Sequence, residues 1–220
     1  MKITNKKLKK LFESFLKEAN SVTTANLSGD LQPNTLIDHT LLKPEATALQ
    51  IEQLCKEAKS LEFKTVCVQP YFVKLARKCL KGSKVLPITV IGFPLGANTT
   101  LTKVFEAKDA IKNGAKEIDM VINISALKSG NYDDVFTDIL SVVRACKKIP
   151  VKVIVETAYL TREEKIFLCA CVQEAKAAFI KTSTGFAPKG AEIEDIVLFK
   201  HLLKDKVKIK ASGGIKNADQ

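Results

Sequence analysis

The sequence VLPITVI at residues 85–91 contains Thr89 as its one polar side chain. Such a nearly continuous apolar run is typical of a strand in a parallel sheet, because helices cover both faces of that kind of sheet. The sequence VKVIV at residues 151–155 is also largely apolar. These two segments predict a parallel sheet at the centre of the fold.

Short apolar runs alternate with stretches of helical periodicity from residue 35 onward, which is the pattern of repeated βαβ units. The predicted strands are residues 35–41, 63–68, 85–91, 116–122, 150–156, 177–181 and 206–210. The predicted helices are residues 47–60, 70–81, 100–113, 132–148, 161–175 and 191–203. The pattern therefore predicts an α/β fold.

Polar residues end or follow almost every predicted strand, and no GxGxxG motif follows the first one, which favours an α/β barrel over an open doubly wound sheet. These residues are Asp38, Asn98, Asp119, Asn123, Glu156, Lys181 and Lys210. In a barrel they would meet at one mouth. A (β/α)8 barrel typically has about 250 residues. We therefore expect a TIM (β/α)8-type barrel that is truncated after the seventh strand, without its eighth β/α unit.

The first twenty residues are rich in lysine and place apolar side chains at helical spacing. These apolar residues are Leu8, Leu11, Phe12, Phe15, Leu16 and Ala19. The pattern predicts an amphipathic helix and not a signal peptide, which needs an unbroken apolar segment. We expect residues 1–33 to form a helical N-terminal extension, either packed on the barrel or mobile, and residues 34–220 to form the barrel domain.

The composition limits the possible functions. The chain has 220 residues, 46% of them hydrophobic and 27% charged, with a net charge of +11. The lysines are scattered and no nucleic-acid-binding motif is present, so the positive field is better suited to a phosphorylated small molecule than to nucleic acid. No stretch approaches the roughly 18 apolar residues of a membrane span. We expect neither a nucleic-acid partner nor a membrane partner.

The six cysteines form no CxxC pair, and the chain has only two histidines. This pattern predicts no zinc site. Most of the cysteines lie within apolar helix or strand patterns, as reduced thiols in a cytoplasmic protein do. We expect a cytoplasmic location and no metal.

Lys181 ends an apolar strand and precedes the turn Thr182-Ser183-Thr184-Gly185. Lys210 ends the next predicted strand. An apolar surrounding lowers the pKa of a lysine, and a second lysine in the same pocket lowers it further, which frees the amine to form a Schiff base with a carbonyl. The alternative is that each lysine extends from its strand end into solvent.

Asp119 is an acid inside the apolar strand 116–122. Beside two active-site lysines it would move protons and act as the electrostatic partner of Lys210, which would keep one amine charged while the other stays free. The alternative is an acid at a strand edge that pairs with a nearby lysine. Gly213 and Gly214 follow the last strand, where barrels commonly bind phosphate with backbone N–H groups. The loop at residues 184–190 would add further amides.

Six motifs occur in the order found in deoxyribose-phosphate aldolases, and the chain resembles that family over residues 34–217. They are IDHTLLKP at 37–44, VCVQP at 66–70, VIGFPLG at 90–96, EIDMVIN at 117–123, KTSTGF at 181–186 and KASGGI at 210–215. The resemblance implies a class I aldolase that reversibly cleaves 2-deoxy-D-ribose 5-phosphate to D-glyceraldehyde 3-phosphate and acetaldehyde. It implies no metal and no organic cofactor.

The resemblance also implies a role for each motif residue. Lys181 would be the Schiff-base lysine, Lys210 the lysine that tunes it, and Asp119 the aspartate of the proton relay. The implied substrate-binding residues are Asp38, Gly185, Gly213 and Gly214, and we expect Cys67 and Thr182 to contact the substrate as well. Cys67 is either a thiol open to the aldehyde product or a buried strand residue, and His39 orients a hydrogen bond of the first strand.

Three further interpretations are left open by the sequence. The chain could be a lysine-dependent aldolase for another sugar phosphate, a catalytically incomplete barrel remnant that binds a partner, or a nucleic-acid-binding protein. A homodimer is compatible with the sequence, which does not set the oligomeric state.

Overall fold

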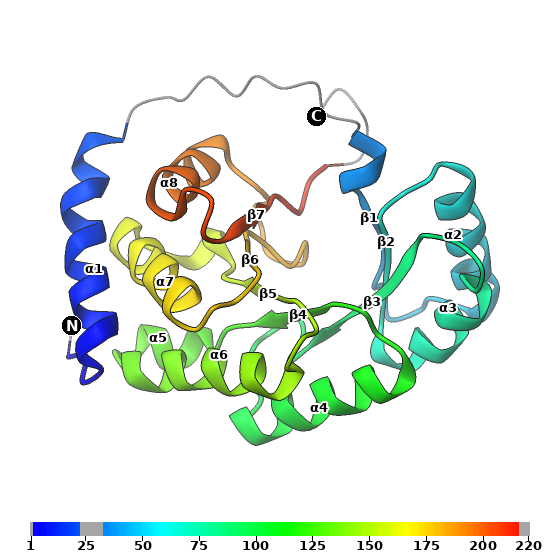
Figure 1. The fold of residues 1–220 in the computed structure, drawn as a ribbon, viewed down its shortest axis with the longest axis horizontal. Helices are drawn as coiled ribbons and strands as arrows, with labels where there is room; N and C mark the ends of the chain where they lie inside the picture. The colour runs from blue at the N-terminus through cyan, green and yellow to red at the C-terminus, as the bar shows by residue number, and fades with distance from the viewer. Residues whose placement is uncertain (1, 23–32, 216–220) are drawn as a thin grey trace.

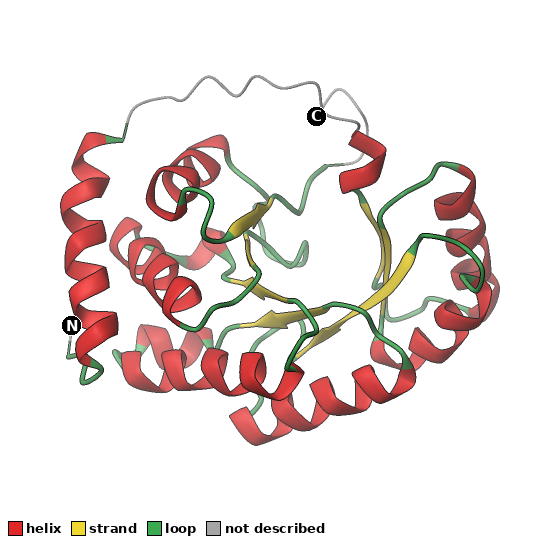
Figure 2. Ribbon diagram, viewed as in Figure 1, coloured by secondary structure: helices red, strands yellow, loops and turns green. Residues whose placement is uncertain are grey.

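The computed structural model describes residues 2–22 and 33–215. In this part of the chain, seven parallel strands form one sheet in sequence order (Figures 1 and 2). The strands are β1 (Asp38–Leu41), β2 (Thr65–Val68), β3 (Leu86–Ile91), β4 (Ile118–Val121), β5 (Val151–Ile154), β6 (Phe179–Lys181) and β7 (Lys208–Lys210). The predicted sheet is confirmed strand for strand, although each strand is shorter than the sequence pattern suggested.

Helices follow the strands and lie along the outside of the curved sheet (Figure 2). The α-helices are α1 (Lys6–Glu18), α2 (Ala48–Ser60), α3 (Val73–Cys79), α4 (Thr100–Asn113), α5 (Ile124–Lys128), α6 (Tyr132–Cys146), α7 (Arg162–Glu174) and α8 (Ile193–Leu203). The short 3₁₀ segments are η1 (Ala19–Ser21), η2 (Pro33–Leu36), η3 (Pro70–Phe72) and η4 (Thr157–Tyr159). The short helix α5 and the 3₁₀ segments were not predicted.

Local sequence signals fix several helix ends. Thr161 and Glu164 form a capping box at the start of α7, as Thr47 and Gln50 do at the start of α2. Gly114 ends α4 with φ of 117°, a left-handed conformation that glycine adopts at no steric cost. The predicted helix 70–81 instead begins as η3 at Pro70 and continues as α3 from Val73.

The sheet curls as the predicted barrel type requires, and within the described residues β1 and β7 are its edge strands (Figure 1). Parallel pairing sets which side chains meet on the inner face. Asp119 of β4 is paired in register with Lys152 of β5, and Lys181 of β6 with Lys210 of β7. The register therefore places an acidic side chain beside a basic one between β4 and β5, and two lysines beside one another between β6 and β7.

The predicted N-terminal helix is confirmed as α1, and it packs against α7 on the outside of the fold (Figure 1). The rings of Phe12 and Phe167 meet edge to face with their centroids 5.7 Å apart. Nη2 of Arg162 donates a hydrogen bond to the carbonyl oxygen of Ala19 at 2.7 Å. Helix α1 thus shares its hydrophobic core with the barrel.

Candidate functional site

Six charged side chains meet inside the curve of the sheet. They are the lysines Lys152, Lys181 and Lys210 and the carboxylates Asp38, Glu117 and Asp119. Side chains two residues apart on a strand point to the same face, which brings Glu117 and Asp119 to the interior together. Burying charges is tolerated only when they are paired, and here each lysine has a carboxylate partner.

Lys181 is buried at the end of β6, and its Nζ lies 2.6 Å from Oδ2 of Asp119. Burial lowers the pKa of Lys181, but the charge of Asp119, aided by Cys67 and Asp38, outweighs it and raises the pKa above the ordinary lysine value. The prediction that the surroundings lower the pKa of Lys181 is therefore wrong. An apolar strand supplied the burial, and the carboxylate reversed its effect.

Asp119 contacts two lysines, one with each carboxylate oxygen. Its Oδ2 accepts from Lys181, and its Oδ1 lies 3.3 Å from Nζ of Lys152. The predicted pairing of Asp119 with Lys210 is wrong. Lys210 pairs with Asp38 at 3.2 Å and donates a hydrogen bond to the carbonyl oxygen of Leu36, because β7 lies at the sheet edge beyond β6.

Lys152 is a site residue that the sequence reasoning missed. It is 2% exposed, forms an ion pair with Glu117, and lies 3.5 Å from Oδ2 of Asp38 as well as beside Asp119. Burial lowers the pKa of Lys152, but Asp119, Asp38 and Glu117 together raise it above the ordinary value. A lysine at the second position of a strand that is otherwise apolar and covered on both faces is the signal that could have revealed it.

Asp38 lies at the start of β1 and faces the same interior. It accepts a hydrogen bond from Oγ1 of Thr65 at 2.7 Å. Burial raises the pKa of Asp38. The opposite effect is larger, because the pKa is lowered by the charges of Lys152 and Lys210, by the hydrogen bond from Thr65 and by the charge of Lys181. The pKa therefore lies below the usual range. Asp38 is therefore held as a carboxylate between two lysine side chains.

The loops after β6 and β7 pack closely together at the same end of the sheet. Gly185, Gly213 and Gly214 have φ values of 86°, 83° and 84°, which suit glycine alone. A Cβ on Gly190 would lie 2.1 Å from the carbonyl oxygen of Gly213, whereas a Cβ on Gly185 or Gly214 would meet nothing within 4 Å. Two of the three predicted phosphate-binding glycines thus border open space.

Thr182 connects these two loops. Its Oγ1 donates to the carbonyl oxygen of Ser212 and accepts from the Ser212 backbone N–H, both at 3.1 Å. Oγ of Ser212 in turn donates to the carbonyl oxygen of Ser183 at 2.6 Å. The hydroxyl of Thr182, predicted to bind substrate, is used here to hold the loops in place.

Glu156 fixes the position of the loop after β6, a role that the sequence reasoning did not assign. It has φ of 59°, a left-handed conformation that is uncommon for a residue with a side chain. Its buried carboxylate accepts hydrogen bonds from the backbone N–H of Thr184 at 3.2 Å and from the Thr184 hydroxyl. A strained residue held by such contacts is typical of functional sites.

Cys67 is fully buried at the interior face of β2, among Ile88 and Val90. Burial, reinforced by Asp119, raises the pKa of its thiol to about 12. The structure therefore supports the interpretation of Cys67 as a buried strand residue. His39 is turned the other way, with its Nε2 2.9 Å from Glu57 of α2.

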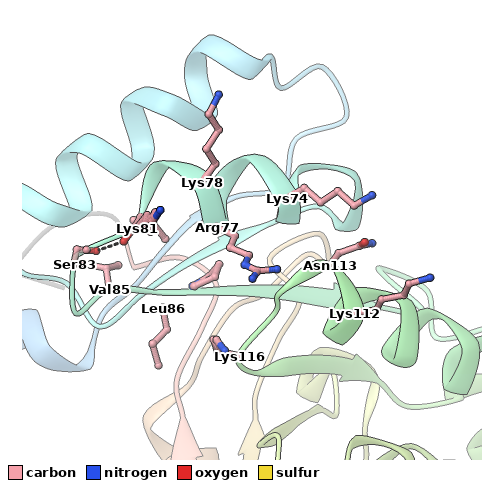
Figure 3. Close-up of a pocket in the computed structure, with 13 residues that line it drawn as sticks. Lys74, Arg77, Lys78, Lys81, Ser83, Val85, Leu86, Lys112, Asn113 and Lys116 are labelled. Carbon is pink, nitrogen blue, oxygen red and sulfur yellow. Dashed lines mark hydrogen bonds between the residues drawn. The ribbon is translucent and has the colours of Figure 1, made fainter.

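Two clefts lie at opposite ends of the strands. One, of about 500 Å³, lies at the carboxyl-terminal ends and is lined by residues such as Leu42, Gln69, Phe93 and Phe186. The other, of about 650 Å³, contains Leu86 and Pro87 at the start of β3 (Figure 3). Its basic side chains are Lys74, Arg77, Lys78, Lys81, Lys112 and Lys116. Because Lys181 and Lys210 end their strands, the apolar cleft and not the basic one is on the side of the site.

Within residues 2–22 and 33–215, no helix is long and apolar enough to cross a membrane. No group of three or more His, Cys, Asp or Glu side chains in the same residues is arranged to hold a metal ion.

A curved parallel sheet with outer helices and a buried lysine at a strand end is the architecture of a barrel aldolase. The family described as DeoC/LacD family aldolase matches residues 34–220. This chain belongs to that family, and it is a lyase of the aldolase type. The resemblance drawn from the six sequence motifs is confirmed.

Related proteins support the same assignment. A deoxyribose-phosphate aldolase of Staphylococcus carnosus is 56% identical over 183 residues, which cover 83% of each chain. A deoxyribose-phosphate aldolase of a Thermoanaerobacter species is 56% identical over 187 residues, covering 84% of each chain. A solved structure from Coccidioides immitis has a TM-score of 0.89 at 38% identity and covers 97% of this chain and 88% of its own.

Proposed function

We propose that this chain is a class I aldolase that reversibly cleaves 2-deoxy-D-ribose 5-phosphate to D-glyceraldehyde 3-phosphate and acetaldehyde. The observation that carries the proposal is the buried amine of Lys181, 2.6 Å from a carboxylate oxygen of Asp119. Relatives at 55–56% identity are named deoxyribose-phosphate aldolases, which supports the choice of substrate. The reaction belongs to the catabolism of deoxyribose phosphates, and we place it in the cytoplasm.

Lys181 is the nucleophile in this proposal. Its free amine attacks the aldehyde carbon of the open-chain sugar, and loss of water from the carbinolamine gives an iminium ion. Removal of the proton from the C3 hydroxyl breaks the C2–C3 bond and releases D-glyceraldehyde 3-phosphate. The electron pair of that bond forms an enamine, which takes a proton at C2, and water then releases acetaldehyde and regenerates the amine. No metal or organic cofactor is needed.

Asp119 and Lys210 move and balance charge around this amine. The carboxylate of Asp119 accepts from the Lys181 ammonium, so it is placed to take the proton that must leave before attack. Lys210 neutralises Asp38 and thereby weakens a second carboxylate that acts on Lys181. The role of Asp38 in the proposal is to contact the hydroxyl region of the substrate.

The glycine loops are the proposed phosphate site. Gly185 and Gly214 border open space beyond the ends of β6 and β7, where backbone N–H groups commonly bind phosphate in barrels. Gly213 allows the close approach of Gly190 that brings the two loops together. Cys67 forms part of the buried wall of the site. Thr182 acts through its hydrogen bonds to Ser212.

Trapping of the Schiff base tests the proposal. The protein is incubated with 2-deoxy-D-ribose 5-phosphate and borohydride, and the adduct is located by peptide mass spectrometry. We expect one reduced adduct on Lys181 and none in Lys181→Met, while Lys152→Met and Lys210→Met show whether another lysine substitutes. Lack of adduct on Lys181 would refute the proposal. An adduct with another sugar phosphate alone would favour a different lysine-dependent aldolase.

One alternative that the sequence left open has less support. A catalytically incomplete remnant would not need the paired lysines and carboxylates to be preserved in contact, yet they are in contact here. A homodimer remains a proposal, and light scattering of the purified protein tests it. The Aeropyrum pernix relative, with a TM-score of 0.76 at 26% identity, is described as a tetramer.

A further inference from the structure

The two oxygens of Asp119 are divided between two lysines. Oδ2 lies 2.6 Å from Nζ of Lys181, and Oδ1 lies 3.3 Å from Nζ of Lys152. All three side chains are buried. A carboxylate that is shared in this way cannot turn both oxygens toward Lys181.

Lys152 is itself held from several sides. Its ammonium forms an ion pair with Glu117 of the segment before β4, and lies 5.3 Å from the centre of the Phe179 ring. Register pairs Lys152 with both Asp119 and Phe179, so these contacts follow from the sheet and not from a chance rotamer. Because Glu117 and Phe179 fix the side chain of Lys152, its ammonium group has a defined position beside Asp119.

We propose that Lys152, anchored by Glu117, is a positioning residue. It holds one carboxylate oxygen of Asp119 and thereby weakens the ion pair between Asp119 and the nucleophilic amine of Lys181. This inference rests on the proposed role of Lys181 in Schiff-base formation. It assigns to Lys152 and Glu117 a function in the reaction although neither reaches the reacting atoms.

The charges that surround Lys181 determine the direction of the effect. The groups that face the interior around Lys181 are Asp38 of β1, Cys67 of β2, Asp119 of β4, Lys152 of β5 and Lys210 of β7. Removal of Lys152 would take away a like charge and would release Asp119 to bind Lys181 with both oxygens. Both changes raise the pKa of Lys181 further, so less free amine is present at a given pH.

The test measures the rate of borohydride trapping on Lys181 as a function of pH, from about pH 6 to pH 10. The variants are Lys152→Met and the double variant Lys152→Met/Glu117→Gln, in which the buried charge remains balanced. In both variants we expect the pH profile of trapping to move to higher pH by about one unit, which is an ordinary size for the pKa shift that a nearby charge causes. Below the midpoint, trapping should be about tenfold slower than in the native protein, and kcat should fall more than KM rises.

A second buried ion pair supplies the matched control. Nζ of Lys103 lies 2.6 Å from Oδ2 of Asp138, and it also donates to the carbonyl oxygen of Val121. Both side chains are buried between helices and lie outside the proposed site. The double variant Lys103→Met/Asp138→Asn loses a comparable buried pair, so its thermal stability should fall while its trapping profile keeps the native midpoint.

The outcomes separate the possible roles. Folded Lys152 variants with the native pH profile would overturn the inference. Failure of both Lys152 variants to fold when the Lys103 control folds would also overturn it, because Lys152 would then be structural. An equal shift in the control would also overturn it. The two proposals fail in different ways. Absence of an adduct in the native protein would contradict the proposed function. An adduct in the native protein whose pH profile is the same in the Lys152 variants would contradict only the role of Lys152.

Discussion

Nζ of Lys210 lies 3.2 Å from Oδ2 of Asp38, and this ion pair joins the two edge strands of the described sheet, β7 and β1. The same amine donates to the carbonyl oxygen of Leu36, just before β1. Lys210 therefore acts on Lys181 through Asp38 and not through Asp119. The strand-end lysine that the sequence suggested as a second amine is in fact a counter-charge.

Substitution of Lys210 should leave Asp38 with a stronger effect on Lys181. We expect Lys210→Met to lower kcat/KM by about tenfold, because a stronger carboxylate near Lys181 raises its pKa by about one unit. Lys210→Arg keeps the charge and should lose less. Steady-state kinetics at pH 7.5 measure the effect, and equal losses in the two variants would show that the charge is not what matters.

Asp119→Asn should lower kcat by about 10²–10⁴-fold, the range observed when a positioned acid or base is removed. The pKa of Lys181 should fall, because burial lowers it and the carboxylate that outweighed burial is gone. Borohydride trapping should therefore begin at lower pH than in the native protein although turnover is slow. Turnover at the native rate would contradict the assigned role of Asp119.

The contact between Glu156 and Thr184 predicts a loss of phosphate binding when it is broken. Glu156→Gln keeps the size of the side chain but weakens its hold on the loop that carries Gly185. We expect KM for 2-deoxy-D-ribose 5-phosphate to rise about tenfold, from the loss of about 1.4 kcal/mol of a charge-assisted hydrogen bond.

The substrate without its phosphate serves as the control for that variant. Turnover of 2-deoxy-D-ribose, measured as kcat/KM, should change little in Glu156→Gln if the loop binds phosphate. A similar loss with both sugars would show that Glu156 supports the whole site and not the phosphate loop in particular.

The buried thiols predict a loss of stability at alkaline pH. Burial raises the pKa of Cys55 and Cys67 to about 12 and that of Cys146 to about 11, and it raises those of Cys169 and Cys171 also. In the unfolded chain these thiols titrate near 9. A raised folded-state pKa stabilises fully below the unfolded value, and the contribution is lost as pH rises toward the folded value.

The free energy of unfolding should therefore fall between pH 9 and pH 11, by about 1.4 kcal/mol per pH unit for each fully titrating thiol. Urea unfolding at pH 8, 9, 10 and 11 measures it. Cys169→Ala/Cys171→Ala should flatten this part of the curve, since two of the thiols are gone. An unchanged slope in that variant would locate the alkaline loss elsewhere, for example in Lys152, whose pKa is also raised.

The sequence was informative wherever a property follows from local pattern. Apolar runs and helical periodicity located every strand of the described sheet, and Lys181, Lys210, Asp119 and Asp38 do share the interior. What the sequence could not supply is strand register, because a shift of two residues changes which acid meets which lysine. The partner of Lys210 was accordingly mispredicted.

Lys152 was missed for a related reason. Barrel sites are built mainly from residues at strand ends, whereas Lys152 lies within β5 and reaches Asp119 by cross-strand pairing. The direction of the Lys181 pKa shift was also wrong, since it is a sum of burial and of charges contributed by several strands. Such a sum requires the distances between charged groups on different strands, and these strands are far apart in the sequence.

Helix α1 bears on how this protein is best produced. Leu8, Phe12 and Phe15 of α1 are buried, and the partner of Phe12 is Phe167 of α7. A recombinant chain that starts at the first family-matched residue, 34, would leave this face of α7 open to water, and large exposed apolar patches promote association. Expression vectors that include residues 1–33 should therefore yield more monodisperse protein, and shortened versions would make catalytic measurements hard to interpret.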